Sequence, residues 1–125
     1  MYIYKNPNPK NKIVGDCVVR AISIALDKEW KDTYTALCLQ GLLLCDMPSS
    51  NKVWKTYLQN NGFSIGIIPD TCPKCYTVAE FASDNARGTY ILGTSTHTIV
   101  VKDGDYYDTW DSGQEVPVFY LYKEE

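Results

Sequence analysis

Apolar side chains in the first half of the chain recur at helical spacing. Asp16 is suited to cap a helix, and an apolar stripe with three- and four-residue spacing follows it as far as Leu26. The same period predicts a second helix over residues 29–44 and a third within residues 50–62. Residues 1–15 are expected to be an extended lead-in, because their Asn-Pro-Asn-Pro segment disfavours helix.

The second half changes to short segments rich in β-branched and aromatic residues. The predicted strands are residues 63–68, 89–92, 96–102, 106–110 and 116–122. The Asp-Gly pair at 103–104 is a strong hairpin signal between two of them. Thr77 and Glu80 form a capping box, which predicts a short helix. Helices followed by antiparallel strands indicate one α+β domain over residues 1–125.

Composition and charge exclude several classes of protein. With 45% hydrophobic and 22% charged residues, the chain is not of the disordered type. Its formal charge of −3 and its scattered basic residues argue against a nucleic-acid partner. We find no run of about 18 apolar residues that would span a membrane, and the polar N-terminus is unlike a signal peptide. We therefore expect a cytoplasmic protein with neither a nucleic-acid nor a membrane partner.

Five cysteines, an odd number without a secretory signal, favour a reduced chain over a disulfide scaffold. Cys72 and Cys75 have the spacing of zinc ligands or of a redox dithiol. Cys38 and Cys45 could add two thiolates, but seven residues of helix would separate them by about 10 Å. We therefore expect a structural loop at 72–75, without a metal or cofactor.

Cys17 and His97 are the candidate reactive pair. The first turn of a helix stabilises a thiolate, and its free amides can also bind an oxyanion, so Cys17 is suited to act as a nucleophile. His97 is the only histidine in the chain and begins a predicted strand, where it could accept the thiol proton. The alternatives are a small core cysteine and a packed or surface histidine.

The predicted hairpin determines which acidic residue lies beside His97. A two-residue turn at 103–104 would pair His97 with Trp110 and place Asp108 diagonally on the same face. Asp111 would then point to the opposite face. A three-residue loop would reverse this parity, and either acid can also be an ordinary turn or strand-end residue. Asp108 is the preferred residue to orient His97, with Asp111 as the alternative.

Aromatic side chains are frequent in both halves of the chain. In the helical half, Trp30, Tyr34, Trp54 and Tyr57 are expected to lie in the core between helices. The aromatic residues that alternate along the last strands either cover the sheet or line a peptide groove next to the site.

Two stretches of the chain resemble the papain-like cysteine peptidases. Residues 15–23 read Gly-Asp-Cys-Val-Val-Arg-Ala-Ile-Ser and open the first helix with a cysteine. Residues 96–101 begin a later strand with a histidine, and residues 104–111 follow with an aspartate, in the order of this family. The chain is most similar to small bacterial and phage members that resemble the peptidases of double-glycine leaders. The fuller papain signature Cys-Gly-Ser-Cys-Trp is absent.

This resemblance implies a fold and a set of site residues. The implied fold is papain-like, with N-terminal helices packed on an antiparallel sheet and the nucleophile at a helix N-terminus. Cys17 would attack a peptide or isopeptide carbonyl, His97 would move the proton, and Asp108 would orient the imidazole. The family places an amide side chain, most often Gln, six residues before the nucleophile as an oxyanion donor. The shorter Asn11 occupies that position here, with the Cys17 amide as the second donor.

Other functions are compatible with the same residues. Amidases, deamidases and acyltransferases use the same apparatus, and a non-catalytic papain-fold protein would keep the fold to bind a partner. A zinc-stabilised binding module is a third class. We expect a thiol hydrolase that acts on a peptide or protein without a cofactor, and no oligomeric state follows from the sequence.

Overall fold

The computed structural model describes residues 1–123, which form four helices and six strands. The helices are α1 (Cys17–Ala25), α2 (Trp30–Leu44), α3 (Asn51–Asn60) and α4 (Val78–Asp84). The strands are β1 (Tyr2–Tyr4), β2 (Ser64–Ile67), β3 (Thr89–Gly93), β4 (Thr98–Lys102), β5 (Asp105–Asp108) and β6 (Phe119–Lys123). The predicted α+β class is confirmed. None of the helices within this range is long and apolar enough to cross a bilayer.

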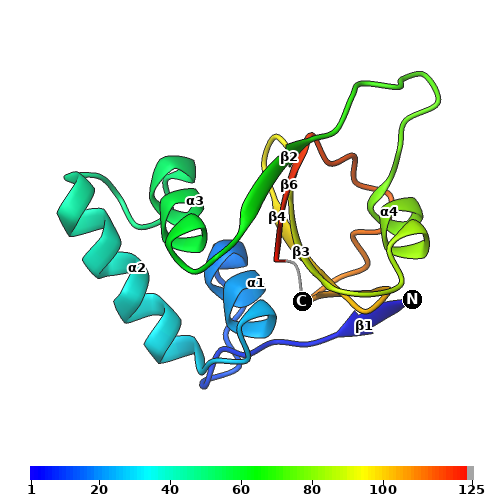
Figure 1. The fold of residues 1–125 in the computed structure, drawn as a ribbon. Helices are drawn as coiled ribbons and strands as arrows, with labels where there is room; N and C mark the ends of the chain where they lie inside the picture. The colour runs from blue at the N-terminus through cyan, green and yellow to red at the C-terminus, as the bar shows by residue number, and fades with distance from the viewer. Residues whose placement is uncertain (124–125) are drawn as a thin grey trace.

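The strands form one sheet in the order β1-β5-β4-β3-β6-β2 (Figure 1). Neighbouring strands are antiparallel except for β1 and β5, which are parallel. The expectation of an antiparallel sheet is therefore wrong at this edge, where the extended lead-in adds a strand. Three residues are too few for a period of two to be recognised in the sequence. The Lys5 amide continues the contact by donating to the Asp108 carbonyl at 3.1 Å.

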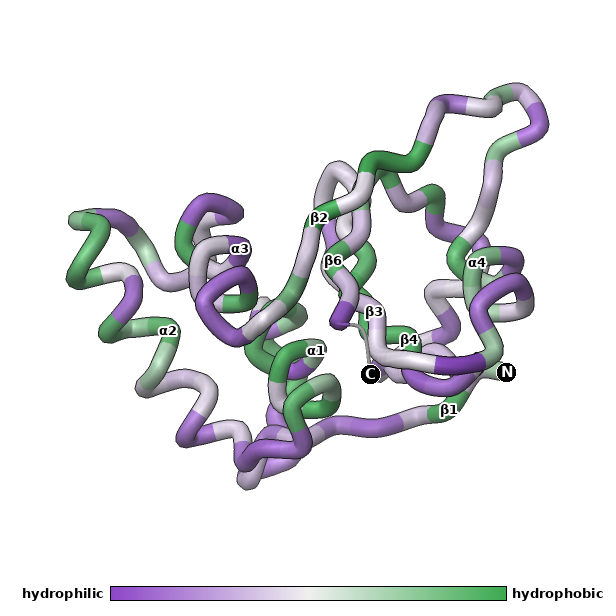
Figure 2. Tube along the Cα trace, viewed as in Figure 1, coloured by the Kyte–Doolittle hydropathy of each residue, from purple (hydrophilic) through white to green (hydrophobic). Residues whose placement is uncertain are grey.

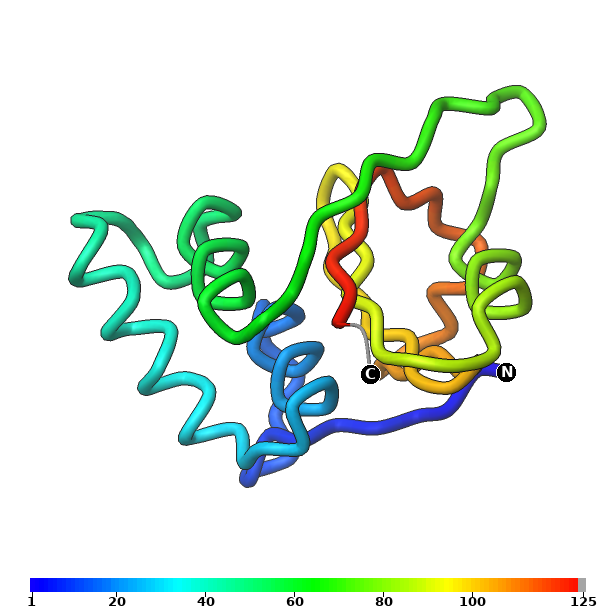
Figure 3. The backbone as a smooth tube through the Cα atoms, viewed as in Figure 1, coloured from blue at the N-terminus to red at the C-terminus, as the bar shows by residue number. Residues whose placement is uncertain are grey.

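Helices cover both faces of the sheet (Figures 1 and 3). Ile91 and Val100 pack into a core with α1, α2 and α3, whereas their neighbours Leu92 and Val101 pack into a second core with α4. Successive side chains of a strand point to opposite faces, so β3 and β4 supply both cores. This arrangement fixes α1 against the centre of the sheet.

Helix α2 lies outside α1 and α3, and Figure 2 shows apolar residues along it. It buries a narrower face than the sequence predicts. The sequence predicts Trp30 and Tyr34 in the core between helices, but Trp30 is only partly buried and Tyr34 is half exposed. Leu37, one turn further along, is fully buried. The exposed apolar side chains at and just beyond its C-terminal half are Leu39, Leu42, Leu43, Leu44 and Met47. Because α2 packs only on its inner side, these residues face away from both cores.

Strands β4 and β5 form the predicted hairpin. Lys102 pairs with Asp105, which leaves a two-residue turn. The turn residues Asp103 and Gly104 have φ values of 51° and 84°, as the type I′ turn requires. The two-residue turn is confirmed, and the parity that favours Asp108 follows from it.

The segment between β2 and α4 projects from the body of the domain (Figure 3). Within it, Cys72 and Cys75 are joined by a disulfide, so the expectation of a fully reduced chain is wrong for this pair. The loop brings their Cα atoms to 4.2 Å, a proximity that spacing alone did not indicate. Cys17, Cys38 and Cys45 are free. In residues 1–123, no three His, Cys, Asp or Glu side chains are grouped as metal ligands.

Candidate active site

Cys17 is the first residue of α1, as the sequence predicts. Its backbone N–H is one of the four at a helix start that lack an intrahelical acceptor. Asp16 occupies the cap position, but its side chain makes no capping hydrogen bond. Cys17 is partly exposed and borders a cavity, so the thiol combines a positive helix end with access to a ligand.

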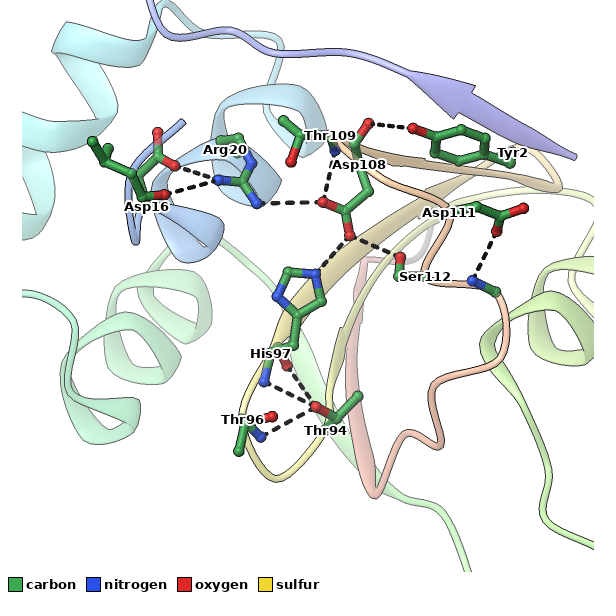
Figure 4. A network of polar contacts seen from close by, with 12 residues as sticks. Tyr2, Asp16, Arg20, Thr94, Thr96, His97, Asp108, Thr109, Asp111 and Ser112 are labelled. Carbon is green, nitrogen blue, oxygen red and sulfur yellow. Dashed lines mark hydrogen bonds and ion pairs between the residues drawn. The ribbon is translucent and has the colours of Figure 1, made fainter. Parts of the chain in front are cut away.

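His97 lies at the end of the tight connection between β3 and β4. The Thr94 hydroxyl oxygen accepts hydrogen bonds from the backbone N–H groups of His97 at 2.9 Å and Thr96 at 3.2 Å (Figure 4). The Thr94 N–H donates in turn to the His97 carbonyl at 2.8 Å. These local bonds fix the backbone from which the imidazole projects.

Asp108, at the end of β5, is 3% exposed and binds His97 directly (Figure 4). Its Oδ2 accepts a 2.6 Å hydrogen bond from His97 Nε2 and one of 2.7 Å from the Ser112 hydroxyl. Its Oδ1 accepts from the Thr109 N–H at 2.8 Å and from Arg20 Nη2 at 3.3 Å. Burial opposes the charge of this carboxylate, but the bonds from His97 and Ser112, the charge of His97 and the Thr109 amide together lower the pKa of Asp108.

Asp111, the alternative orienting residue, is turned away from the imidazole (Figure 4). Its Oδ1 accepts a 2.6 Å hydrogen bond from the Tyr106 hydroxyl and one of 3.0 Å from the Gly113 N–H. Of the two acids weighed from the sequence, the structure therefore brings Asp108 to His97 and leaves Asp111 to close the turn after β5.

The electrostatics of Cys17 and His97 are complementary. Burial disfavours the thiolate, but hydrogen bonds with His97 and the Thr98 backbone, and the charges of His97 and Arg20, outweigh it and lower the pKa of Cys17. Burial also disfavours the imidazolium, yet hydrogen bonds with Asp108 and Cys17 and the charges of both raise the pKa of His97 to about 9. Because Asp108 occupies Nε2, the thiol is left with Nδ1. The site thus favours a thiolate–imidazolium pair.

A cavity of about 530 Å³ lies next to this pair, within the range typical of ligand sites. Its aromatic lining residues are Trp30, Tyr34, Trp54 and Phe119. Trp54 is fully buried, as expected of a core residue, whereas Trp30 and Tyr34 border the cavity on the inner side of α2. Three of the four aromatic residues that the sequence predicts in the helix core therefore also form part of the wall of this cavity, whereas Tyr57 is buried in the core away from it.

Asn11 is not brought to the cavity. It is exposed in the lead-in segment, and its Oδ1 faces Nδ2 of Asn6 at 3.5 Å. Its φ of 53° turns the backbone into the left-handed region that Asn tolerates, which is consistent with a turn residue. The free backbone N–H groups at the start of α1 are therefore the candidate hydrogen-bond donors next to the thiol.

Two residues that contact Asp108 were not singled out in the sequence. Arg20 interrupts the apolar stripe of α1 four residues after Asp16, and an isolated arginine on a buried stripe could have indicated a buried ion pair. Ser112 follows the strand without any pattern, so nothing in the sequence indicates its role.

Comparisons of this chain with protein-family models, curated proteins and solved structures give no match. The chemical interpretation of the site therefore rests on its own geometry.

Proposed function

We propose that this protein is a papain-like thiol hydrolase that cleaves a peptide or isopeptide bond through Cys17, His97 and Asp108. The observation that carries this proposal is the 2.6 Å contact between His97 and Asp108 beside a thiol at a helix N-terminus. A buried carboxylate, an imidazole and an activated thiol in this sequence of contacts form the arrangement used in nucleophilic catalysis.

In the proposed reaction, the thiolate of Cys17 attacks the substrate carbonyl and forms a tetrahedral intermediate. The imidazolium of His97 then donates its Nδ1 proton to the leaving amine, the carbon–nitrogen bond breaks, and a thioester remains on Cys17. A water molecule then gives a proton to Nδ1 as it attacks the thioester. The second tetrahedral intermediate collapses with cleavage of the carbon–sulfur bond, which releases the acid and restores the thiolate–imidazolium pair. Asp108 holds the ring through Nε2 during both steps.

The oxyanion of each intermediate needs hydrogen-bond donors. The N–H of Cys17 has no intrahelical acceptor and lies at the positive end of α1. Asn11, which the family resemblance suggests as a second donor, would have to move toward the cavity when substrate binds. We assign the first role to the Cys17 amide and treat Asn11 as a residue that contributes only after such a movement.

Amidases, deamidases and acyltransferases would use the same first step and differ in the acceptor of the acyl group. A non-catalytic interaction protein would not need a thiol whose pKa is lowered or a carboxylate that orients its histidine. The two pKa shifts toward an ion pair therefore favour an enzyme over a binding module.

The proposal is tested with a proteome-derived peptide library and with proteins that carry isopeptide links, incubated with wild type and with the Cys17→Ala variant. Mass spectrometry should detect new amino and carboxyl termini, or free lysine side chains, with the wild type only. Wild-type protein that gives no products, while Cys17 also reacts no faster than an ordinary thiol, would favour the interaction module instead.

A further inference from the structure

Arg20 is the buried cation of the site. It lies on α1 one turn after Cys17 and is only 6% exposed. One guanidinium nitrogen, Nη1, binds Asp16 and donates to the Val14 carbonyl at 3.4 Å, and the other, Nη2, donates to Asp108 Oδ1 at 3.3 Å (Figure 4). Its partners are therefore Asp108, which binds His97, and two residues that directly precede Cys17 in the sequence or lie within three residues of it.

The charges around Arg20 come from three segments of the chain. Asp16 and Asp108 are buried carboxylates on either side of the guanidinium, and His97 faces Asp108 from the connection between β3 and β4. Asp16 also accepts a 2.9 Å hydrogen bond from the indole N–H of Trp30, which borders the cavity. One guanidinium thus bridges two carboxylates. Without it, the negative charges of both would remain buried, with only neutral hydrogen-bond donors and His97 to compensate them.

The contacts of Asp108 divide between its two oxygens. Arg20 and the Thr109 amide bind Oδ1, whereas His97 and Ser112 bind Oδ2. Donors on both oxygens fix the rotation of the carboxylate about its Cβ–Cγ bond. The direction of Oδ2 toward the imidazole therefore depends on the donors that bind Oδ1, which are Arg20 and the Thr109 amide.

We propose that Arg20 is a positioning residue for catalysis, which holds Asp108 from the nucleophile's own helix so that Oδ2 stays directed at His97. This inference rests on the proposed function and adds a fourth residue to it. Because Cys17 and Arg20 are a turn apart on α1, the same helix places the nucleophile and aligns the group that orients its base. A planar guanidinium can bridge two carboxylates, whereas an ammonium binds as a point charge and cannot hold both in one geometry.

The test compares wild type with Arg20→Gln and Arg20→Lys. Arg87, the only other arginine in the chain, is exposed, and Arg87→Gln is the matched control. For each protein, the rate of Cys17 alkylation by iodoacetamide is measured by mass spectrometry between pH 5 and 9.5. Far-UV circular dichroism and a thermal melt record whether each variant is folded.

We expect the pH midpoint of alkylation to rise by about one unit in Arg20→Gln, equivalent to a tenfold lower thiolate fraction below the midpoint. Arg20→Lys should shift it less, and Arg87→Gln should not shift it. A residue that only stabilises the fold would lower the melting temperature without moving the midpoint. Folded Arg20 variants with the wild-type midpoint, or loss of the fold in both, would overturn the inference.

A double-mutant comparison separates positioning from a direct charge effect on Cys17. If Arg20 acts through Asp108, Arg20→Gln should produce little further shift in an Asp108→Asn background. An equal shift in both backgrounds would overturn the positioning role while leaving the hydrolase proposal intact. A wild-type Cys17 with ordinary thiol reactivity would overturn the hydrolase proposal and this inference together.

Discussion

His97 and Trp110 lie opposite each other just beyond the last paired residues of the β4–β5 hairpin, with ring centroids 5.2 Å apart. The indole is about half exposed, whereas the His97 side chain is 12% exposed. Trp110 therefore covers one side of the imidazole and limits the orientations open to the ring.

Replacement of Trp110 tests this shielding. In Trp110→Ala we expect Cys17 alkylation at pH 7 to slow several-fold, because the imidazole loses a neighbour that limits its orientations. Trp110→Phe keeps a ring and should stay close to wild type. Alkylation rates of the three proteins, measured by mass spectrometry, check this expectation. Equal rates for Ala and Phe variants would show that the indole merely covers the sheet.

The imidazole of His97 should titrate near pH 9, because hydrogen bonds and charges from Asp108 and Cys17 outweigh the effect of burial. NMR can follow this directly, since the chain has one histidine. In Cys17→Ser the pKa of His97 should fall, because the thiolate contribution is lost. A pKa near 6.5 in the wild type would contradict the ion pair.

The raised pKa of His97 also has a consequence for stability. Folding favours the protonated ring, so its contribution to the free energy of unfolding is complete below pH 6.5 and is lost as the pH rises through about 9. The measurement is the free energy of unfolding in urea at pH 6 and at pH 9.5. The decrease between the two pH values should be smaller in Cys17→Ser than in wild type, and this contribution should be absent in His97→Gln. The lowered pKa of Cys17 acts in the opposite direction within the same range, so the three proteins must be compared together.

Cys17 should be the most reactive of the free thiols. With limiting iodoacetamide at pH 6.5, we expect Cys17 to be labelled before Cys38 and before the more exposed Cys45, because His97 and the helix start lower the pKa of Cys17. Peptide mapping by mass spectrometry gives the order. Faster labelling of Cys45 would mean that exposure, rather than thiolate formation, controls reactivity.

Asp108→Ala should slow Cys17 alkylation at neutral pH by roughly tenfold, equivalent to about one pKa unit. The imidazole would lose its hydrogen-bond partner at Nε2 and with it the support for its positive charge. Asp111→Ala is the matched control, since this carboxylate contacts Tyr106 and Gly113 instead. If only the Asp111 variant were slower, the two roles would have to be exchanged.

Much of the fold could be predicted from local patterns. The apolar stripe after Asp16, the capping box at Thr77 and the Asp-Gly turn at 103–104 each depend on neighbouring residues, and each is present. The parallel pairing of β1 and the narrow buried face of α2 depend on which element lies alongside, which no local pattern contains.

The candidate site divides in the same way. Turn length and the period of two predict that Asp108 shares a face with His97, and these two features are local. The contact of Arg20 with Asp108 joins a helix to a distant strand, so it depends on tertiary packing. The family spacing predicts that Asn11 lies at the site, whereas a turn in the lead-in segment directs its side chain toward Asn6.

The order of the site residues along the chain affects when the thiol becomes reactive. Cys17 is synthesised well before His97, Thr98 and Asp108, which supply the ring, the amide and the carboxylate on which the lowered pKa of Cys17 depends. Until the β4–β5 hairpin docks on α1, a nascent chain therefore carries a thiol without its activating partners. Chemical reactivity of this cysteine is consequently a marker of completed folding.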